Sequence, residues 1–195
     1  MTGTIQPSIY RETSNGFLTY SLQDEMLMHR EVECVGEIDA DMAHTLTRQL
    51  RYLQRQDPNA EITLIIDSPG GEVNAGLSIY DVMCGLSCPI RTVCLSTAAS
   101  MASVLFAAGT KREMLPHSRI MIHDPRMMQG PGGTALEIEQ LSRNILRCRD
   151  NMADILAACT GKTRAQILKK TTTDCWFTPP EAIEFGLADS VIHSI

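Results

Sequence analysis

The sequence lacks the features that mark nucleic-acid-binding and membrane proteins. It has no run of Lys or Arg, and 17 basic against 23 acidic residues give a formal net charge of −6. Nucleic acids and anionic membranes are bound through clustered basic residues, so we expect neither partner. No stretch reaches the roughly 18 uninterrupted apolar residues of a membrane span, and the first residues show no basic segment followed by an apolar one. We therefore expect a cytoplasmic protein.

The cysteines neither pair nor cluster in the sequence. There are seven of them, an odd number, widely scattered and without a C-x-x-C pair. This pattern suggests neither a disulfide framework nor a zinc site. We expect no metal ion, and a reducing compartment fits best.

What the sequence does contain is the composition of one globular domain. Its 195 residues are 44% hydrophobic and 21% charged, which is enough for one sizeable core and too short for two comfortable domains. The first 30 residues read as an irregular arm with a short helix near its end. A strand over 30–38 and an amphipathic helix over 39–57, capped by Asp39, are expected to follow.

Strands then alternate with helices along the chain. The segments 61–67, 89–96 and 118–123 are short β-branched or apolar runs, and the segments between the three have helical spacing. Such alternation predicts an α/β fold with a mainly parallel sheet and right-handed crossovers. A long helix over 134–160, ended by Gly161, is expected to project from the core or to pack against another subunit.

Three unusual features fall at the carboxyl ends of these predicted strands, where parallel α/β sheets bind ligands. Gly70 and Gly71 allow backbone N–H groups to face outward as an anion site, although they also suit an ordinary turn. Ser100 precedes an apolar helix, where a serine is usually a cap, but its hydroxyl could act as a nucleophile with the N–H of Met101 holding an oxyanion. His123 ends a strand and could be its base.

A histidine base also needs an orienting carboxylate. The sequence offers four candidates, and spacing alone does not choose among them: Asp67, Asp124, Asp150 and Asp174.

Four motifs together resemble one family. "SPGGEVNAGLSIYD", "AASMAS", "LPHSRIMIHDP" and "PPEAIEFGLADSVI" are similar to the proteolytic subunits of the Clp protease, ClpP. The resemblance runs from the arm to the C-terminus. It implies a serine endopeptidase with a crotonase-like ββα repeat fold, in which Ser100 is the nucleophile, His123 the base and Asp174 the orienting carboxylate. The implied oxyanion donors are the backbone N–H groups of Gly71 and Met101.

The resemblance also implies an organisation and an assembly. Residues 1–30 would form an arm with an axial loop and a short helix, and 31–195 a single catalytic domain with a projecting handle over about 124–160. Two heptameric rings would stack around a chamber, and an AAA+ unfoldase would feed unfolded polypeptides into it using ATP. The chain has no G-x-x-x-x-G-K-[ST] motif, so we expect no cofactor here and ATP hydrolysis by the partner.

Several residues depart from the family pattern. Asp124 stands where the family has Gln, and it could favour the protonated form of His123. "RMM" at 126–128 replaces "LGG", and Thr172 and Thr173 replace an Asp-Arg pair that couples the rings. These changes suggest a divergent second paralogue that works in mixed rings with another ClpP. A self-sufficient homo-oligomer is an equal alternative.

Two other function classes remain open. Crotonases share the implied fold and use paired backbone N–H groups, so acyl-CoA chemistry is one alternative, although it needs no serine triad. The other is a weakly active or regulatory subunit that keeps the fold and stacks with an active paralogue.

Overall fold

A mainly parallel seven-stranded sheet organises the computed structural model, which describes residues 7–126 and 132–195. The strand order is β3-β4-β5-β6-β9, with β7 pairing with β5 and β8 pairing with β7. Only the β7–β8 pair of this sheet is antiparallel. The strands are β3 (Glu31–Ile38), β4 (Ile62–Gly71), β5 (Ile90–Ala99), β6 (Lys111–Met114), β7 (Arg119–Ile122), β8 (Cys175–Phe177) and β9 (Ser190–Val191). The predicted α/β class with a mainly parallel sheet is confirmed.

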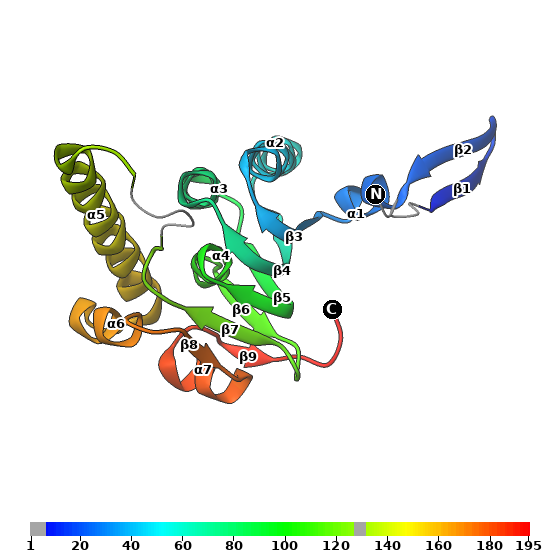
Figure 1. The fold of residues 1–195 in the computed structure, drawn as a ribbon. Coiled ribbons are helices and arrows are strands. Elements are labelled where there is room, and N and C mark those ends of the chain that lie inside the picture. The colour runs from blue at the N-terminus through cyan, green and yellow to red at the C-terminus, as the bar shows by residue number, and fades with distance from the viewer. Residues whose placement is uncertain (1–6, 127–131) are drawn as a thin grey trace.

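Helices cover this sheet as the alternating pattern predicts (Figure 1). The helix α2 (Ala40–Gln56) starts at Asp39, whose side chain accepts a hydrogen bond from the N–H of Met42, so the predicted cap is confirmed. The helix α3 (Val73–Gly85) follows β4. After β5 comes α4 (Met101–Ala107), of which every residue is buried.

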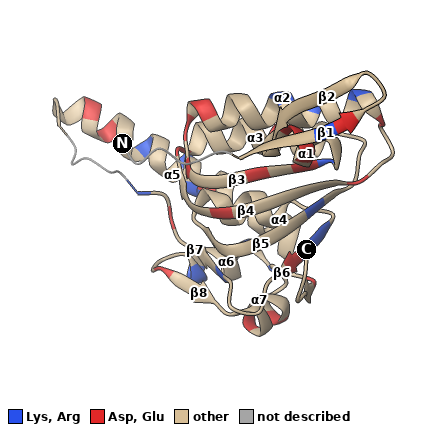
Figure 2. Cartoon of the chain, turned by 90° about the vertical axis from the view of Figure 1, so that its right-hand side faces the viewer, with Lys and Arg blue, Asp and Glu red and all other residues tan. Residues whose placement is uncertain are grey.

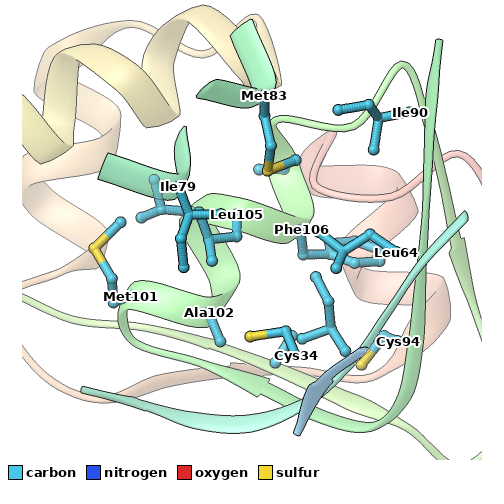
Figure 3. Packing of buried hydrophobic residues seen from close by; sticks show 14 of the residues in the cluster. Cys34, Leu64, Ile79, Met83, Ile90, Cys94, Met101, Ala102, Leu105 and Phe106 are labelled. Atoms are coloured by element: carbon cyan, nitrogen blue, oxygen red, sulfur yellow. The ribbon is translucent and has the colours of Figure 1, made fainter. Parts of the chain in front are cut away.

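The helix α4 lies at the centre of the hydrophobic core. Met101, Leu105 and Phe106 lie among side chains of α3 and the sheet, including Ile79 and Leu64 (Figure 3). A helix that is apolar all round is stable only when it is enclosed, as here. Met101, the first residue of this helix, is therefore packed on every side.

The N-terminal arm is more ordered than expected. Instead of an irregular segment, β1 (Ser8–Thr13) and β2 (Gly16–Ser21) form an antiparallel hairpin, and it leads into the predicted short helix α1 (Leu22–Met28). Gly16 follows Asn15 at the turn and has φ +119°, a value that favours glycine. Figure 1 shows the hairpin extending away from the sheet.

Two strands of the sheet run further than expected and three were not predicted. β4 continues through the "SPGG" segment because Ile38 of β3 pairs with Gly71, and β5 continues to Ala99 because its last residues pair with β7. The unexpected strands β6, β8 and β9 have four, three and two residues. Strands this short carry no readable alternation.

The C-terminal third contains the predicted long helix. The helix α5 (Ala135–Thr160) is followed by α6 (Arg164–Lys170) and α7 (Pro179–Phe185). α5 ends at Gly161, which has φ +69°. Its buried residues all lie in the second half: Met152, Ala153 and Leu156. Its first half exposes three large apolar side chains, Leu136, Ile138 and Leu146, and Figure 1 shows this half beyond the edge of the sheet.

Charged residues are interspersed over the surface. Figure 2 shows Lys and Arg residues scattered among acidic ones on the side that faces the viewer. Within residues 7–126 and 132–195, no helix has the length and apolar character needed to cross a membrane.

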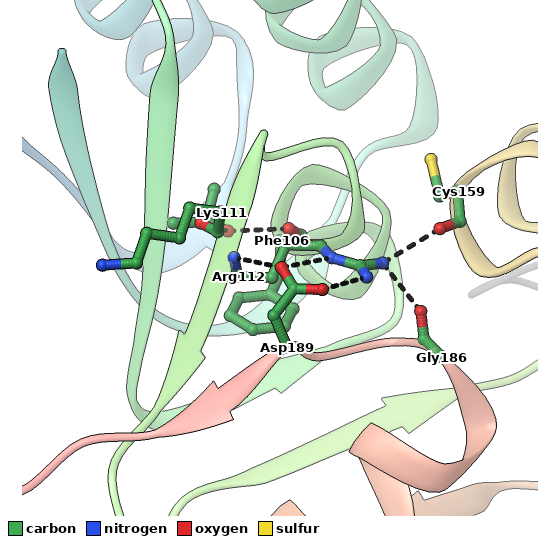
Figure 4. A network of polar contacts seen from close by, with 7 residues as sticks. Phe106, Lys111, Arg112, Cys159, Gly186 and Asp189 are labelled. Carbon is green, nitrogen blue, oxygen red and sulfur yellow. Dashed lines mark hydrogen bonds and ion pairs between the residues drawn. The ribbon is translucent and has the colours of Figure 1, made fainter.

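Arg112 joins three C-terminal segments to the sheet (Figure 4). From β6, its guanidinium donates to the carbonyl oxygens of Cys159 and Gly186 at 2.9 and 2.7 Å, and it pairs with the Asp189 carboxylate at 2.5 Å. These partners lie at the end of α5, at the end of α7 and just before β9. The Arg112 side chain is 14% exposed and its contacts with the two carbonyl oxygens are partly buried, so these oxygens depend on it more than the exposed Asp189 carboxylate does.

We therefore expect Arg112→Lys to lower the free energy of unfolding by about 2 kcal/mol, because one ammonium group cannot satisfy all three partners. Urea unfolding at fixed protein concentration measures this. Arg143→Lys is the matched control, since Arg143 forms an exposed pair with Glu139 on α5, and we expect a change within about 0.5 kcal/mol. Equal effects of the two substitutions would contradict the role given to Arg112.

Candidate active site

Ser100 lies at a sharp turn between β5 and α4. Its backbone has φ +54° and ψ −123°, a conformation that costs a residue with a side chain on the order of 1–3 kcal/mol. The neighbouring structure holds it there. Its N–H donates to the carbonyl of Met121 at 2.8 Å, and its carbonyl accepts from the N–H and the hydroxyl of Ser103 at 3.0 and 2.6 Å. The turn therefore fixes the position of the Ser100 side chain and directs it away from the line of β5.

His123 follows β7, the strand next to β5. The parallel register pairs Ala99 with Met121, so the residues just after the two strands come out side by side. His123 Nε2 lies 2.7 Å from Ser100 Oγ, within hydrogen-bond distance. The His123 side chain is 13% exposed. The structure thus brings together the serine and histidine that the sequence places at separate strand ends.

Asp174 reaches the same point from β8, on the other side of β7. The antiparallel register pairs Ile122 with Cys175, so Asp174 comes out beside His123. Its Oδ1 lies 3.5 Å from His123 Nδ1, an ion-pair distance that is longer than a good hydrogen bond. His123 Nδ1 is buried and has no hydrogen-bond partner within the described residues.

The other three candidate aspartates are engaged elsewhere. Asp67 Oδ1 accepts from the N–H of Thr97 at 3.1 Å, Asp124 binds Thr171 and Arg149, and Asp150 pairs with Arg164 at 2.7 Å. Of the four carboxylates that the sequence left open, the structure places Asp174 at the imidazole.

Arg126 also lies at this site, although nothing in the sequence indicates that its charge would act there. Its guanidinium forms an ion pair with Asp174 Oδ1, the same oxygen that faces His123. Burial, followed by the positive charge of Arg126, lowers the pKa of His123 below its ordinary value, while the charges of Asp174 and Asp124 act the other way. The expectation that Asp124 would favour the protonated form is thus right in sign for that one charge, but the net shift of the pKa is downward.

The "SPGG" segment lies against the serine turn. Gly70 has φ +96°, and a Cβ at this position would come within 2.7 Å of both the Ala99 carbonyl oxygen and Ser100 Cβ. At Gly71 a Cβ would collide with the backbone of Ile38. Only glycine allows this close approach. Met101 is the first residue of α4, so its backbone N–H has no acceptor within that helix.

A small, mostly apolar recess of about 30 Å³ opens beside Ser100 and His123. Its apolar lining residues are Val73, Met101, Val104, Ile122, Pro125, Met152 and Leu156. A larger hollow of about 610 Å³ lies between the arm and α2, where Leu18, Tyr20 and Tyr52 are among the lining residues, but it contains no nucleophile and base. Volume alone would therefore select a place away from Ser100 and His123.

The remaining departures are placed in part. Met127 and Met128, of the expected "RMM" segment, lie outside the described residues. Thr172 donates its hydroxyl to the Lys169 carbonyl at 3.0 Å at the end of α6. Among the described residues, no group of three His, Cys, Asp or Glu side chains is arranged to hold a metal ion.

Comparison with known proteins agrees with these motifs. The family model described as Clp protease matches residues 14–194. The "ATP-dependent Clp protease proteolytic subunit" of Porphyromonas gingivalis (strain ATCC BAA-308 / W83) is 39% identical over 191 residues, which cover 97% of this chain and 85% of that protein. The motifs at the strand ends and a match over nearly the whole length lead to the same conclusion: this chain belongs to the Clp protease family.

Proposed function

We propose that this chain is a serine endopeptidase subunit of a Clp-type protease, with Ser100 as nucleophile, His123 as base and Asp174 as orienting carboxylate. The observation that carries the proposal is the 2.7 Å contact between Ser100 Oγ and His123 Nε2, at the ends of two paired strands. The family membership supports the same activity.

The proposed reaction runs in two stages, acylation and hydrolysis. The Ser100 hydroxyl attacks the peptide carbonyl carbon while His123 Nε2 takes its proton, and the backbone N–H groups of Gly71 and Met101 stabilise the oxyanion. His123 then gives this proton to the leaving amine as the C–N bond breaks, which leaves an acyl-serine. Water, deprotonated by His123, hydrolyses the ester and restores the serine. Each oxyanion donor contributes about 3 kcal/mol to stabilising the transition state.

Asp174 would hold the His123 ring and stabilise the imidazolium that forms. Arg126 pairs with the same Asp174 oxygen, so the guanidinium and the imidazolium compete for this oxygen during the reaction. Arg126 therefore changes the pKa of His123 but does not itself act as the base.

The proposed assembly is two stacked heptameric rings that receive unfolded polypeptides from an ATP-driven AAA+ unfoldase in the cytoplasm. The exposed apolar side chains on the first half of α5 support this, because a helix that exposes them needs another surface to cover them. Mixed rings with another ClpP are the alternative assembly.

Ser100→Ala should reduce peptide hydrolysis by roughly four orders of magnitude, because the serine and histidine act as one unit. The intact mass after treatment with diisopropyl fluorophosphate tests the same residue, and we expect one adduct on the wild type and none on Ser100→Ala. Ser78→Ala, which removes a hydroxyl that only bonds within α3, should behave as the wild type.

Two results would contradict the proposal. One is a wild type that takes up no adduct both alone and when mixed with a second ClpP. The other is thioester hydration or isomerisation that survives Ser100→Ala, which would point to acyl-CoA chemistry instead.

The pH dependence of kcat/KM should reflect the charges around His123. The base must be neutral to accept a proton, so its lowered pKa places the acid limb below the pH expected for an ordinary histidine, about 6.5. Arg126→Gln removes a charge that lowers this pKa, and the acid limb should move to higher pH. Asp174→Asn removes a charge that raises it, so the limb should move to lower pH with a large loss of kcat. Identical limbs for the wild type and Arg126→Gln would argue against an electrostatic role for Arg126.

The stacking role of α5 is tested by Leu146→Asp. Leu146 is 54% exposed in the single chain, so this substitution should leave the fold intact but place a charge in a covered interface. We expect native mass spectrometry to show particles of about half the wild-type mass. Asn59→Asp, in the loop between α2 and β4, adds the same charge and should leave the particle unchanged. A wild-type particle from Leu146→Asp would rule out this face.

A further inference from the structure

Asp124, the residue after His123, is held at three points. Its N–H donates to the carbonyl of Thr171 at 2.7 Å, and its Oδ1 accepts from the Thr171 hydroxyl at 2.5 Å. Its Oδ2 accepts from Arg149 Nε at 2.6 Å. Both carboxylate oxygens are therefore engaged, one by α5 and one by the segment that leads to Asp174.

The Thr171 contact closes a short loop that contains Asp174. At one end of this loop Thr171 binds Asp124, and at the other end Cys175 pairs with Ile122. His123 lies between the two anchor residues of its own segment. Asp174 thus faces His123 from a segment fixed on both sides, although the two side chains are 3.5 Å apart and make no hydrogen bond.

Burial gives the Thr171 contact its importance. Thr171 is 5% exposed, so its hydroxyl has little access to water as a replacement partner. A hydrogen bond to a carboxylate is stronger than one between neutral groups, and loss of the donor would leave the carboxylate oxygen unsatisfied.

Arg149 connects the same carboxylate to the long helix. It lies on α5 between the exposed first half and the buried residues that begin at Met152. The Arg149 and Asp124 side chains are 27% and 28% exposed, so this ion pair is partly protected from solvent. A shift of α5 along or across the sheet would pull directly on the residue next to His123.

We propose that Asp124, Thr171 and Arg149 form a brace that positions His123 against Asp174 and couples this alignment to α5. These are positioning residues, since the side chains act through His123 and Asp174 and do not touch the reacting atoms. The inference rests on the proposed peptidase function.

The sharpest test compares three threonine variants of the full-length protein. Thr171→Val keeps the shape and removes the hydroxyl, Thr171→Ser keeps the hydroxyl and removes the methyl group, and Thr172→Val removes the hydroxyl of the next residue, which only binds Lys169. The measurements are kcat and KM on a short peptide, and the rate at which diisopropyl fluorophosphate modifies Ser100.

We expect Thr171→Val to lower kcat and the modification rate by roughly tenfold or more with KM within about twofold, because a small misplacement of a catalytic group is costly. Thr171→Ser and Thr172→Val should stay within about threefold of the wild type. Equal losses in Thr171→Val and Thr171→Ser would indicate a packing role and overturn the brace, as would a wild-type kcat in Thr171→Val.

Arg149→Gln keeps the test decisive if Thr171→Val does not fold, because Arg149 is partly exposed. We expect it to lower kcat without changing KM, and Asp124→Asn combined with it should lower kcat by less than the product of the single effects. Independent effects would overturn the coupling to α5. A wild type that is neither modified nor active would overturn the proposed function and the brace together, whereas an active wild type with an unaffected Thr171→Val and Arg149→Gln would overturn the brace alone.

Discussion

The pairing of β7 between β5 and β8 is the constraint on which the site depends. A parallel register to β5 sets His123 beside Ser100, and an antiparallel register to β8 sets Asp174 beside His123. The backbone pairing of the three strands therefore places these residues side by side, and the side-chain contacts follow from that placement. A slip of one residue in either register would turn the side chains to the opposite face and separate the three groups.

The core supplies the second constraint, at the serine. Ser100 occupies a backbone conformation that an isolated chain would leave, and such strain persists only when the surroundings fix it. The enclosed helix α4 provides this, because Met101 and the residues after it are packed on all sides. Gly70 of β4 then fits against the turn, and Gly71 against the backbone of Ile38, where a larger residue would not fit. Stability of the core and the position of the Ser100 hydroxyl are thus consequences of the same packing.

Much of this could be predicted from the sequence, and the failures have physical reasons. The βα alternation and the carboxyl-end rule placed Gly70, Ser100 and His123 on one edge of the sheet, since parallel strands end together. Asp174 is placed beside His123 by β8, whose three residues are too short for a periodic pattern. The residues alone therefore leave the choice among the four aspartates open, and only the family resemblance points to Asp174. β4 was ended too early because "SPGG" reads as a turn, whereas its pairing with Ile38 extends the strand. The hairpin of the arm was missed although Asn15-Gly16 is a turn signal.

The charges around the histidine could not be read from spacing at all. The Asp124 charge does raise the pKa of His123, as its place in the sequence indicates, but the sequence does not show that its carboxylate also binds Thr171 and Arg149. Arg126, three residues after His123, pairs with Asp174 instead. Two oppositely charged residues in one short segment thus make separate contacts: Arg126 pairs with the Asp174 carboxylate, and Asp124 binds Arg149 of α5. In the proposed assembly α5 is also the helix that meets the opposite ring, so the helix that would hold the particle together contacts, through Arg149, the segment that carries His123, the proposed base.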